Sequence, residues 1–393
     1  MTRSHLLPRD AAAIGGIGQT EFSRDAGRTE LQLASEAVLA ACADAQIDVG
    51  DIDGLVSYTI DPVEETELVR TAGLQEVGYS ARVPYGGGGS VGVLMHAAAA
   101  VASGVADIVV AYRAVRARSG ATRFGGAKVA VNVGNTHAGT TASQWCMPHG
   151  VLTPASWMAL NATRYMHQFG VTNEDFGRAV VQLRAYAATN PDAWGYRRPT
   201  TLTDHQASRW IAEPAIRMFD CCQETDGAIA LVVTSRERAA AMPNPPVAIA
   251  AVAGAGLFEQ EIASDHYRPD LSVMDSSVVL GRRLFDDAGF RRDDIDLAMI
   301  YDAFSPILLM QLEALGFCAF GEANDFVADG NLAPGGALPC NTNGGLIGEG
   351  YIHGLNLVTE AVRQIRGTAA NQLPSVDVAL VSASRTGAIL TRI

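Results

Sequence analysis

The chain has 393 residues, of which 48% are hydrophobic and 18% are charged, and its formal net charge is −13. This length favours two domains over one, and the composition is that of a folded enzyme without a low-complexity tract. The acidic charge argues against nucleic acid or an anionic membrane as a partner, because a phosphate-binding surface needs clustered lysine and arginine.

The N-terminal residues do not resemble a secretory signal peptide, since they lack an apolar core and a cleavage site before a strand pattern begins. The longest apolar stretch, residues 93–112, contains His96, Gly104 and Asp107. It therefore predicts a helix followed by a strand rather than a membrane span. We expect a cytoplasmic protein.

Two segments far apart in the chain predict the same order of elements. Residues 31–59 predict a helix, a turn and a strand that ends at Tyr58, and residues 278–302 predict the same elements and a strand that ends at Tyr301. The tripeptide Asp-Ile-Asp introduces the strand in both segments, at residues 51–53 and again at 294–296.

The repetition continues in a second pair of segments. Residues 85–114 (YGGGGSVGVLMHAAAAVASGVADIVVAYRA) predict a glycine cluster, a helix and a strand, and residues 343–385 predict the same order. Two long matching units indicate a duplicated α/β half. We place the first half at residues 1–245 and the second at 246–393. Between the repeated units, residues 116–217 predict an inserted cap, which includes a helix at 154–170.

The cysteines and the single lysine exclude several kinds of site. None of the six cysteines forms a C-x-x-C pair or has a histidine at zinc-ligand spacing, so we expect neither a disulfide framework nor a bound metal. Lys128 lies in the insertion, away from the glycine loops. A lysine Schiff-base aldolase is therefore not expected, and we expect no bound cofactor.

Together, the duplicated halves, the glycine-led helices and the inserted segment resemble the thiolase superfamily, and most closely its sterol-carrier-protein branch. Residues 208–235 (SRWIAEPAIRMFDCCQETDGAIALVVTS) and 326–354 (FVADGNLAPGGALPCNTNGGLIGEGYIHG) add to this resemblance. It implies a thiolase fold of two duplicated α/β halves in αβαβα layers, with an inserted loop domain.

The residues that thiolase chemistry requires are missing. A thiolase acylates a cysteine at the start of the first-half helix, and here Gly88 or Gly89 stands at that position. The neighbouring Ser90 is expected to cap the helix instead. In the late glycine loop, which we define as residues 341–354 and call the late loop below, Tyr351 follows Gly-Glu-Gly where a thiolase has a histidine. Thiolysis or Claisen condensation through an acyl-cysteine is therefore not expected.

The substituted residues resemble those of the thiolase-like steroid side-chain aldolases of bacterial sterol and bile-acid catabolism. The resemblance rests on Tyr301-Asp302-Ala303-Phe304 and on residues 344–354 (GGLIGEGYIHG). It implies a retro-aldol lyase that cleaves a 17-hydroxy steroid acyl-CoA to a 17-keto steroid and propionyl-CoA or another short acyl-CoA. It also implies an OB-fold partner with a zinc ribbon, sometimes fused to a hydratase, and a homodimer within an α2β2 heterotetramer. Zinc is expected on the partner alone.

A retro-aldol step needs a base for the hydroxyl proton, stabilisation of a thioester enolate and an acid for the α-carbon. We predict that Tyr301 and Tyr351 are the base and the acid, in either order, and that His353 assists. A phenol of pKa ~10 is a weak base, so a nearby helix N-terminus is expected to favour its phenolate. The predicted substrate- and CoA-binding residues are Gly88, Gly89, Asp302, Gly345, Glu349 and Gly350. Glycine amides at these positions would approach a thioester oxygen closely.

Other interpretations stay open from sequence. A tyrosine at a strand end is commonly a packing residue, and a histidine beside a helix start is commonly a cap. Cys221 and Cys222 are expected to pack within a strand. The chain could also be a divergent 3-ketoacyl-CoA thiolase or acetyltransferase, or a silent scaffold subunit that binds acyl-CoA. Two tyrosines at pocket positions favour chemistry over a silent role.

Overall fold

A nine-stranded sheet runs through the computed structural model, which describes residues 11–84, 87–120, 146–257 and 268–393. Lys128 lies outside the described residues. The strands follow the order β3-β2-β4-β7-β1-β8-β11-β10-β9. The first five are β3 (Tyr79–Val83), β2 (Gly54–Tyr58), β4 (Ile108–Arg116), β7 (Asp226–Ser235) and β1 (Ala12–Gln19). The other four are β8 (Val247–Gly254), β11 (Thr386–Arg392), β10 (Val378–Ser382) and β9 (Leu297–Ile300).

The two halves of the sheet repeat one pairing pattern. In the first half, β2 pairs in parallel with β4, β4 is antiparallel to β7, and β7 is antiparallel to β1. In the second half, β9, β10, β11 and β8 repeat these three pairings in the same order. The halves meet where β1 pairs with β8 through two residue pairs. The predicted duplicated α/β fold is confirmed, whereas the domain limits at residues 245 and 246 stay predictions.

The repeated Asp-Ile-Asp tripeptide has one structural role in both halves. The carboxylate of Asp53 accepts hydrogen bonds from the amides of Asp107 and Ile108 at 2.8 Å each. In the second half, Asp296 accepts from the amides of Asp377 and Val378 at 2.8 and 2.9 Å. Each aspartate therefore satisfies the first amides of the neighbouring parallel strand, β4 or β10, and fixes where that strand begins.

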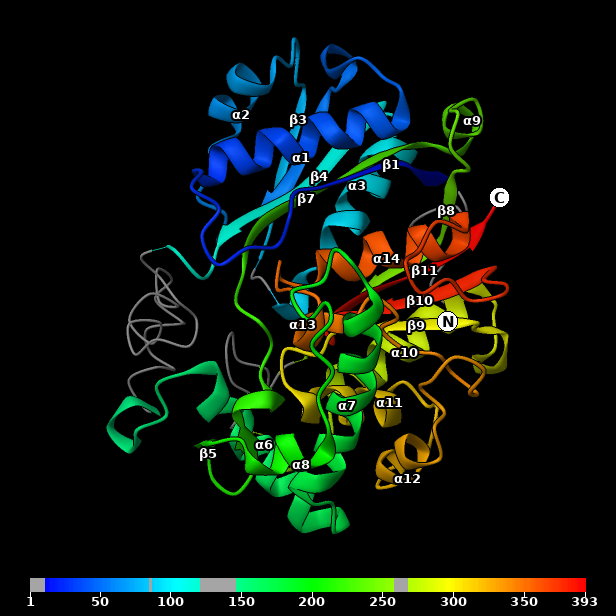
Figure 1. The fold of residues 1–393 in the computed structure, drawn as a ribbon. Coiled ribbons are helices and arrows are strands. Elements are labelled where there is room, and N and C mark those ends of the chain that lie inside the picture. The colour runs from blue at the N-terminus through cyan, green and yellow to red at the C-terminus, as the bar shows by residue number, and fades with distance from the viewer. Residues whose placement is uncertain (1–10, 85–86, 121–145, 258–267) are drawn as a thin grey trace.

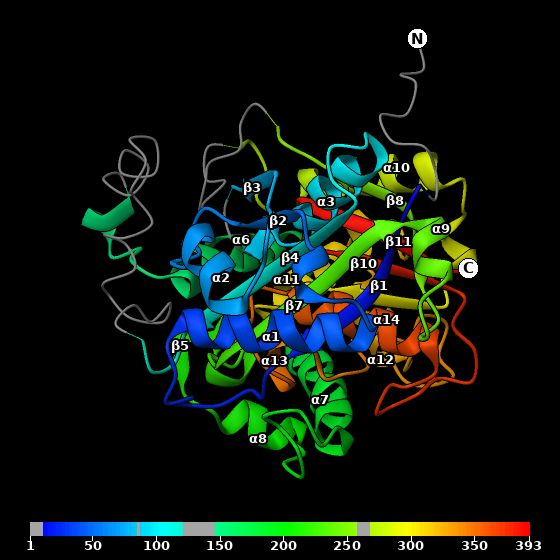
Figure 2. The same ribbon diagram turned by 90° about the horizontal axis from the view of Figure 1, so that it is seen from above.

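Helices separate and cover the two halves of the sheet in five layers. Helices α3 (Gly92–Ala102) and α14 (Leu355–Arg366) each contact strands of both halves and form the central layer. Helix α1 (Glu30–Ala45) packs outside β1, β4 and β7, and α10 (Asp275–Ala288) packs outside β8 and β11. Figure 2, seen from above, shows α1 lying across the first-half strands, and Figure 1 shows α14 below these strands, between them and β11 and β10. This is the predicted αβαβα arrangement.

The cap consists of helices on one side of this core, below it in Figure 1. It contains α6 (Pro154–Phe169), α7 (Asn173–Thr189), α8 (Leu202–Ala207) and the ribbon of β5 (Trp210–Ala212) and β6 (Ile216–Arg217). The sequence predicted α6 but not α7, which begins at a capping box formed by Thr172 and Asp175. The remaining helices are α2 (Glu65–Ala72), α9 (Arg236–Ala240), α11 (Ser305–Ala314), α12 (Ala323–Ala328) and α13 (Gly345–Gly348).

Asp220, in the cap segment that leads back to β7, joins the cap to the core. Its carboxylate accepts a hydrogen bond from the Ser305 hydroxyl (2.5 Å) at the start of α11 and from the Asn173 amide (3.0 Å) at the start of α7. It also contacts Nε2 of His205 at 2.8 Å. All four side chains are buried, so the cap is anchored directly to the helix that follows Tyr301.

Glycines of the late loop allow α7 to pack closely against α13. A Cβ added at Gly344 or at Gly348 would lie 2.6 Å from the Cβ of Ala187 on α7, and Gly344 also has a φ of +107°. Of the glycines in this loop, Gly345 and Gly350 were expected to approach a thioester oxygen. At Gly344 and Gly348 the lack of a Cβ is needed for helix packing.

Within the described ranges, no helix is both long and apolar enough to cross a membrane. The expected cytoplasmic location stays a prediction.

We predict that Gly348→Ala destabilises the fold. The added methyl group would overlap Ala187 and approach the Leu183 carbonyl oxygen at 3.3 Å, and overpacking of this kind costs about 1–3 kcal/mol. Urea unfolding should therefore show a lower free energy of unfolding. Gly78→Ala is the matched control, because nothing lies within 4 Å of its added Cβ. Equal stability of the two variants would contradict the packing role.

Candidate active site

Tyr301 and Tyr351 form a buried pair where the two halves meet. Their hydroxyl oxygens are 2.9 Å apart, and their rings are inclined at 63° with centroids 6.4 Å apart. Tyr301 directly follows β9, and Tyr351 lies between α13 and α14. The structure therefore brings together the two tyrosines that the sequence predicts to face each other across a pocket. Their catalytic roles stay predictions at this point.

The backbone around both tyrosines is held by surrounding elements. The amide of Tyr301 donates to the carbonyl of Ser382 on β10 (2.8 Å), and its carbonyl accepts from the Gln311 side chain on α11 (2.8 Å). The amide of Tyr351 donates to the Thr225 hydroxyl at 3.0 Å, just before β7. The pair is thus positioned by strands of both halves and by a core helix.

Two glycines enclose the Tyr301 side chain. A Cβ at Gly87 would lie 2.6 Å from the Tyr301 hydroxyl oxygen, and a Cβ at Gly354, which has a φ of +88°, would lie 2.9 Å from Cδ2 of its ring. The predicted Gly88 lies instead against the turn before β11, where its carbonyl accepts from the Arg385 amide (3.2 Å). The predicted Gly89 is buried within the same glycine cluster. Gly87, which the sequence analysis did not single out, is the glycine that faces Tyr301.

The prediction that Ser90 caps the first-half helix is wrong. Helix α3 begins at Gly92 after Val91, without a side-chain cap. The Ser90 hydroxyl is buried and has no hydrogen-bond partner among the described residues. Its carbonyl accepts from the Tyr58 hydroxyl at 2.7 Å, which fixes the backbone of the glycine cluster.

Burial dominates the ionisation of the tyrosine pair. It raises the pKa of Tyr301 far above the ordinary value, and the neighbouring Tyr351, Cys222 and Asp302 raise it further. Burial also raises the pKa of Tyr351, but the positive charge of Arg113 opposes that rise. Contrary to our expectation, the surroundings do not lower either pKa below that of a free phenol. Both hydroxyls are therefore neutral at rest, and the Arg113 charge favours ionisation on the Tyr351 side of the pair.

His353 adjoins the pair and is held by a buried cation. Its ring contacts the Tyr351 ring at a centroid distance of 5.0 Å, and its backbone is left-handed with a φ of +53°. Nε of Arg113, on β4, donates to Nδ1 of His353 at 2.8 Å, and Nη1 of Arg113 donates to the Asp61 carboxylate at 2.8 Å. Burial, together with the charge of Arg113, lowers the pKa of His353 well below its usual value, so the ring is neutral.

Arg113 and Asp61 were not among the site residues expected from sequence. No motif marks them, and the one available signal was an arginine within the otherwise apolar strand of residues 108–115 (IVVAYRAV). A cation inside a covered strand needs a buried partner. The partners, His353 and Asp61, lie 240 and 52 positions away in sequence.

Asp302 and Gly345 hold the late loop. The Asp302 carboxylate is buried and accepts from the amides of Leu346 (2.8 Å) and Ile347 (3.2 Å) in α13. Burial raises the pKa of Asp302 to about 7, against the effect of these hydrogen bonds. The amide of Gly345 already donates to Asn343 (3.0 Å), and any Cβ at Gly345 would overlap the Asp302 carboxylate. The two hydrogen bonds of Asp302 join α13 to the end of β9.

Glu349 and Gly350 connect the same loop to α14. The Glu349 carboxylate accepts from the side-chain amides of Asn343 (2.5 Å) and Asn356 (2.7 Å), and burial raises its pKa to about 8. The Gly350 carbonyl accepts from the Asn356 side chain at 3.2 Å. Gly350 has no Cβ, and an added Cβ would lie 2.7 Å from the Phe22 ring. These contacts keep the segment that carries Tyr351 in place.

Cys222, expected to pack within a strand, lies before β7 and beside the tyrosine pair. Its amide donates to the Ala303 carbonyl at 2.9 Å. Burial, and then the neighbouring Cys221, raise the pKa of its thiol well above the ordinary value. The side chain is a free thiol. It is therefore a protonated group beside the site rather than an activated nucleophile.

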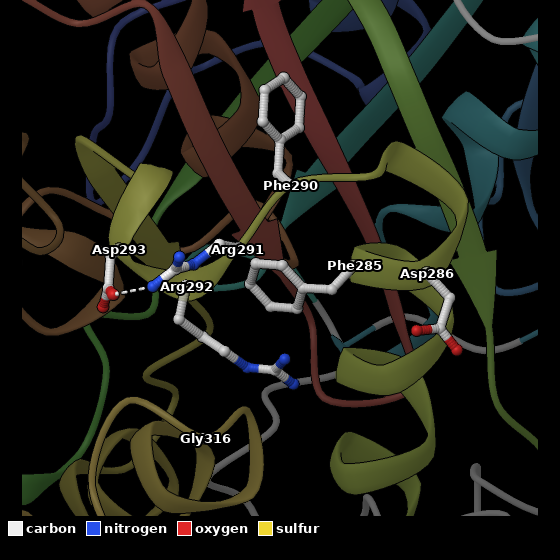
Figure 3. Close-up of a pocket in the computed structure, with 7 residues that line it drawn as sticks. All are labelled: Phe285, Asp286, Phe290, Arg291, Arg292, Asp293 and Gly316. Atoms are coloured by element: carbon white, nitrogen blue, oxygen red, sulfur yellow. Dashed lines mark hydrogen bonds and ion pairs between the residues drawn. The ribbon is translucent and has the colours of Figure 1, made fainter.

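A separate pocket of about 420 Å³ lies at the end of α10 (Figure 3). Its lining residues are Phe285, Asp286, Phe290, Arg291, Arg292, Asp293 and Gly316. The Arg292 guanidinium stacks 4.2 Å from the centre of the Phe285 ring, and its Nε donates to the Leu315 carbonyl at 3.1 Å. These contacts join α10 to α11 and include no residue of the tyrosine pair. In the described parts of the chain, no group of three or more histidine, cysteine or acidic side chains is arranged to hold a metal ion.

Comparison with known proteins agrees with this fold. The family model Thiolase C-terminal domain-like matches residues 259–392. A steroid side-chain-cleaving aldolase of Thermomonospora curvata is 50% identical over 378 residues, which are 96% of each chain. A 17-hydroxy-3-oxo-4-pregnene-20-carboxyl-CoA lyase of Mycobacterium tuberculosis is 48% identical over 95% of this chain and 96% of that protein.

A solved structure of an Ltp2-ChsH2(DUF35) aldolase superposes with a TM-score of 0.93 at 48% identity and covers 99% of both chains. Identity of this extent over whole chains shows common family membership, beyond a shared fold. The chain belongs to the thiolase superfamily, in the family that contains these steroid side-chain-cleaving aldolases.

Proposed function

We propose that this protein is a carbon–carbon lyase that cleaves the side chain of a 17-hydroxy steroid acyl-CoA by a retro-aldol reaction. The products are a 17-keto steroid and propionyl-CoA, or another short acyl-CoA. The observation that carries the proposal is the buried Tyr301–Tyr351 pair, with hydroxyl oxygens 2.9 Å apart. The names of the relatives, which are about half identical over almost the whole chain, support the substrate class.

The reaction moves one proton from oxygen to carbon. A base removes the proton of the 17-hydroxyl, and a carbonyl forms as the bond from carbon 17 to the α-carbon of the thioester breaks. The bonding electrons pass into the thioester as an enolate, which an acid then protonates at carbon. The β-hydroxythioester supplies its own electron sink, so the step needs neither a covalent intermediate nor a cofactor, and coenzyme A enters as part of the substrate.

In its rare singly ionised form, in which the two oxygens share one proton, the tyrosine pair can perform both transfers. Tyr351 is the proposed base, because the positive charge of Arg113 favours its ionisation. Tyr301, whose neighbours disfavour ionisation, protonates the α-carbon. A proton then crosses the 2.9 Å hydrogen bond from Tyr351 to Tyr301, and the pair returns to its starting state. His353 is the third proposed catalytic residue, as a neutral neighbour of Tyr351.

The chemistry of the described thiols disfavours the thiolase alternative. A thiolase nucleophile must be a thiolate. Glycines occupy the position of that cysteine, and the thiol beside the tyrosines, Cys222, stays protonated because burial raises its pKa well above normal. The silent-scaffold alternative gives no reason for the surroundings to place two buried phenols within hydrogen-bond distance.

We further propose that the lyase works with an OB-fold partner that carries a zinc ribbon, in an α2β2 heterotetramer built on a homodimer of this chain. The support is that the similar solved structure is named an Ltp2-ChsH2(DUF35) aldolase, which pairs two protein names. Zinc is proposed for the partner alone. Asp302, Gly345, Glu349 and Gly350 are proposed to shape the substrate and CoA site by holding the late loop, together with Gly88 and Gly89 of the facing cluster.

The proposed reaction gives two products, which can be measured together. Incubation of the purified protein and its partner with 17-hydroxy-3-oxo-4-pregnene-20-carboxyl-CoA should release the 17-ketone and propionyl-CoA in equal amounts, measured by mass spectrometry. A 3-ketoacyl-CoA with free CoA is the control substrate and should give no thiolysis. Thiolysis without steroid cleavage would support the thiolase alternative and refute the lyase.

The second prediction concerns the tyrosine pair. Tyr301→Phe and Tyr351→Phe should each lower kcat by about 10²–10⁴-fold, the contribution typical of a positioned acid or base. The double variant should be little worse than either single variant, because the two hydroxyls act as a unit. Tyr186→Phe is the control, since it removes a buried hydroxyl that donates to the Leu332 carbonyl outside the site. Near-normal turnover of both single variants in the assembled complex would refute the assignment.

A further inference from the structure

Arg113 is the largest of the fully buried side chains, with 2% of its surface exposed. A buried guanidinium is costly unless ion pairs and hydrogen bonds replace its hydration. Nη1 donates to the carboxylate of Asp61 (2.8 Å) and to the carbonyl of Ala114 (2.6 Å), and Nε donates to Nδ1 of His353 (2.8 Å). The last bond joins β4 of the first half to the late loop of the second.

This bond determines which hydrogen His353 can carry. Nδ1 accepts from Arg113, so its lone pair is occupied and it bears no proton. A neutral imidazole has one N–H, which must then lie on Nε2. His353 is therefore a fixed hydrogen-bond donor at Nε2, and its ring adjoins that of Tyr351. It has no free lone pair with which to act as a base.

Asp61 in turn limits the influence of the Arg113 charge. Its Oδ2 also accepts from the amide of Ala114 (3.2 Å), and its Oδ1 accepts from the amide of Val63 (3.0 Å). Both members of the ion pair are thus fixed by backbone groups as well as by each other. The positive charge is held in one place, and the carboxylate and the histidine accept from different nitrogens of the guanidinium.

We propose that Arg113 is a positioning residue for carbon–carbon cleavage. By donating to Nδ1 of His353 it holds this ring as a neutral Nε2–H donor beside Tyr351, and its charge favours the ionised form of the tyrosine pair, while Asp61 moderates that charge. The proposal rests on the lyase function proposed above and assigns the surroundings of the base.

Charged and titratable groups reach the tyrosine pair from several elements. Tyr301 and Asp302 follow β9, Cys222 and Glu224 precede β7, and Arg113 lies on β4. Cys222 and Glu224 oppose ionisation of Tyr351, as does its burial, whereas Arg113 favours ionisation. Removal of the Arg113 charge should therefore lower the fraction of ionised pair, and removal of the opposing Asp61 charge should raise it.

The first test needs no substrate. The full-length protein is labelled with ¹⁵N-histidine, and the ring resonances of His353 are identified by their loss in His353→Gln. The expected tautomer carries its proton on Nε2 and stays neutral down to a pH at which the protein begins to unfold. In Arg113→Gln the ring should become a mixture of tautomers or titrate near its ordinary pKa. A parent ring with its proton on Nδ1 would overturn the proposal even if the steroid is cleaved.

The second test compares charge variants of the assembled complex during steroid cleavage. At pH 7, Arg113→Gln should lower kcat by about tenfold or more, the effect of about one pKa unit or more from a nearby charge. Asp61→Asn, which keeps an oxygen acceptor for Arg113, should leave kcat equal to or above that of the parent. Arg113→Lys, which keeps the charge, should restore most of the kcat lost in Arg113→Gln. KM should change by less than about twofold in all three variants, because the effect is on ionisation rather than on substrate binding.

The opposite directions separate positioning from mere structural support. A residue that only stabilises the fold would lower kcat in both Arg113→Gln and Asp61→Asn, and such a joint fall would overturn the proposal. If a single variant does not fold, the double variant Arg113→Gln/Asp61→Asn leaves no unpaired buried ion and should still show the low kcat of a site without its cation. Parent-like kcat in the double variant would also overturn it. Failure of the parent complex to cleave any steroid substrate would instead refute the proposed function.

Discussion

The close approach of the two duplicated halves is the constraint on which the site depends. Two glycine-led central helices begin near one another, and Tyr301 fits between them because Gly87 and Gly354 present no side chain to it. Only this absence lets its hydroxyl reach that of Tyr351. The same packing buries both tyrosines. In buried surroundings, each nearby charge acts more strongly on their ionisation than it would in solvent.

Burial strengthens the electrostatic interactions on which the proposed chemistry depends, but it also opposes ionisation of the two tyrosines. It raises the pKa of each phenol, and so the ionised form that a base requires is rare. A buried cation on a neighbouring strand acts in the other direction. The same strand in the first half therefore supplies the charge, while the late loop of the second half supplies Tyr351 and His353. All three proposed catalytic residues thus lie in the second half, and the first half supplies the buried cation that contacts one of them.

Several glycines of the loop before α14 serve packing rather than direct contact with a substrate. Gly344 and Gly348 allow α7 to rest against α13, and Gly345 leaves space for the Asp302 carboxylate. Through these contacts the cap, the late loop and the end of β9 form one continuous support. Asp220 adds a second connection from the cap to α11. The position of the tyrosines is thus determined by a set of buried polar contacts that link all three parts of the chain.

The sequence by itself determined the duplicated α/β fold and the cap helix at 154–170, and it identified Tyr301 and Tyr351 as candidate site residues. These features depend on local periodicity and on motifs that are contiguous in the chain. The repeated aspartate before each strand was also visible, although its hydrogen bonds were not. Tertiary structure decided what no local pattern contains: that Gly87 faces Tyr301, that Ser90 caps nothing, and that Cys222 lies beside the pair. It also decided the partners of Arg113, since a buried charge finds them through folding across 240 positions of sequence and not through spacing along it.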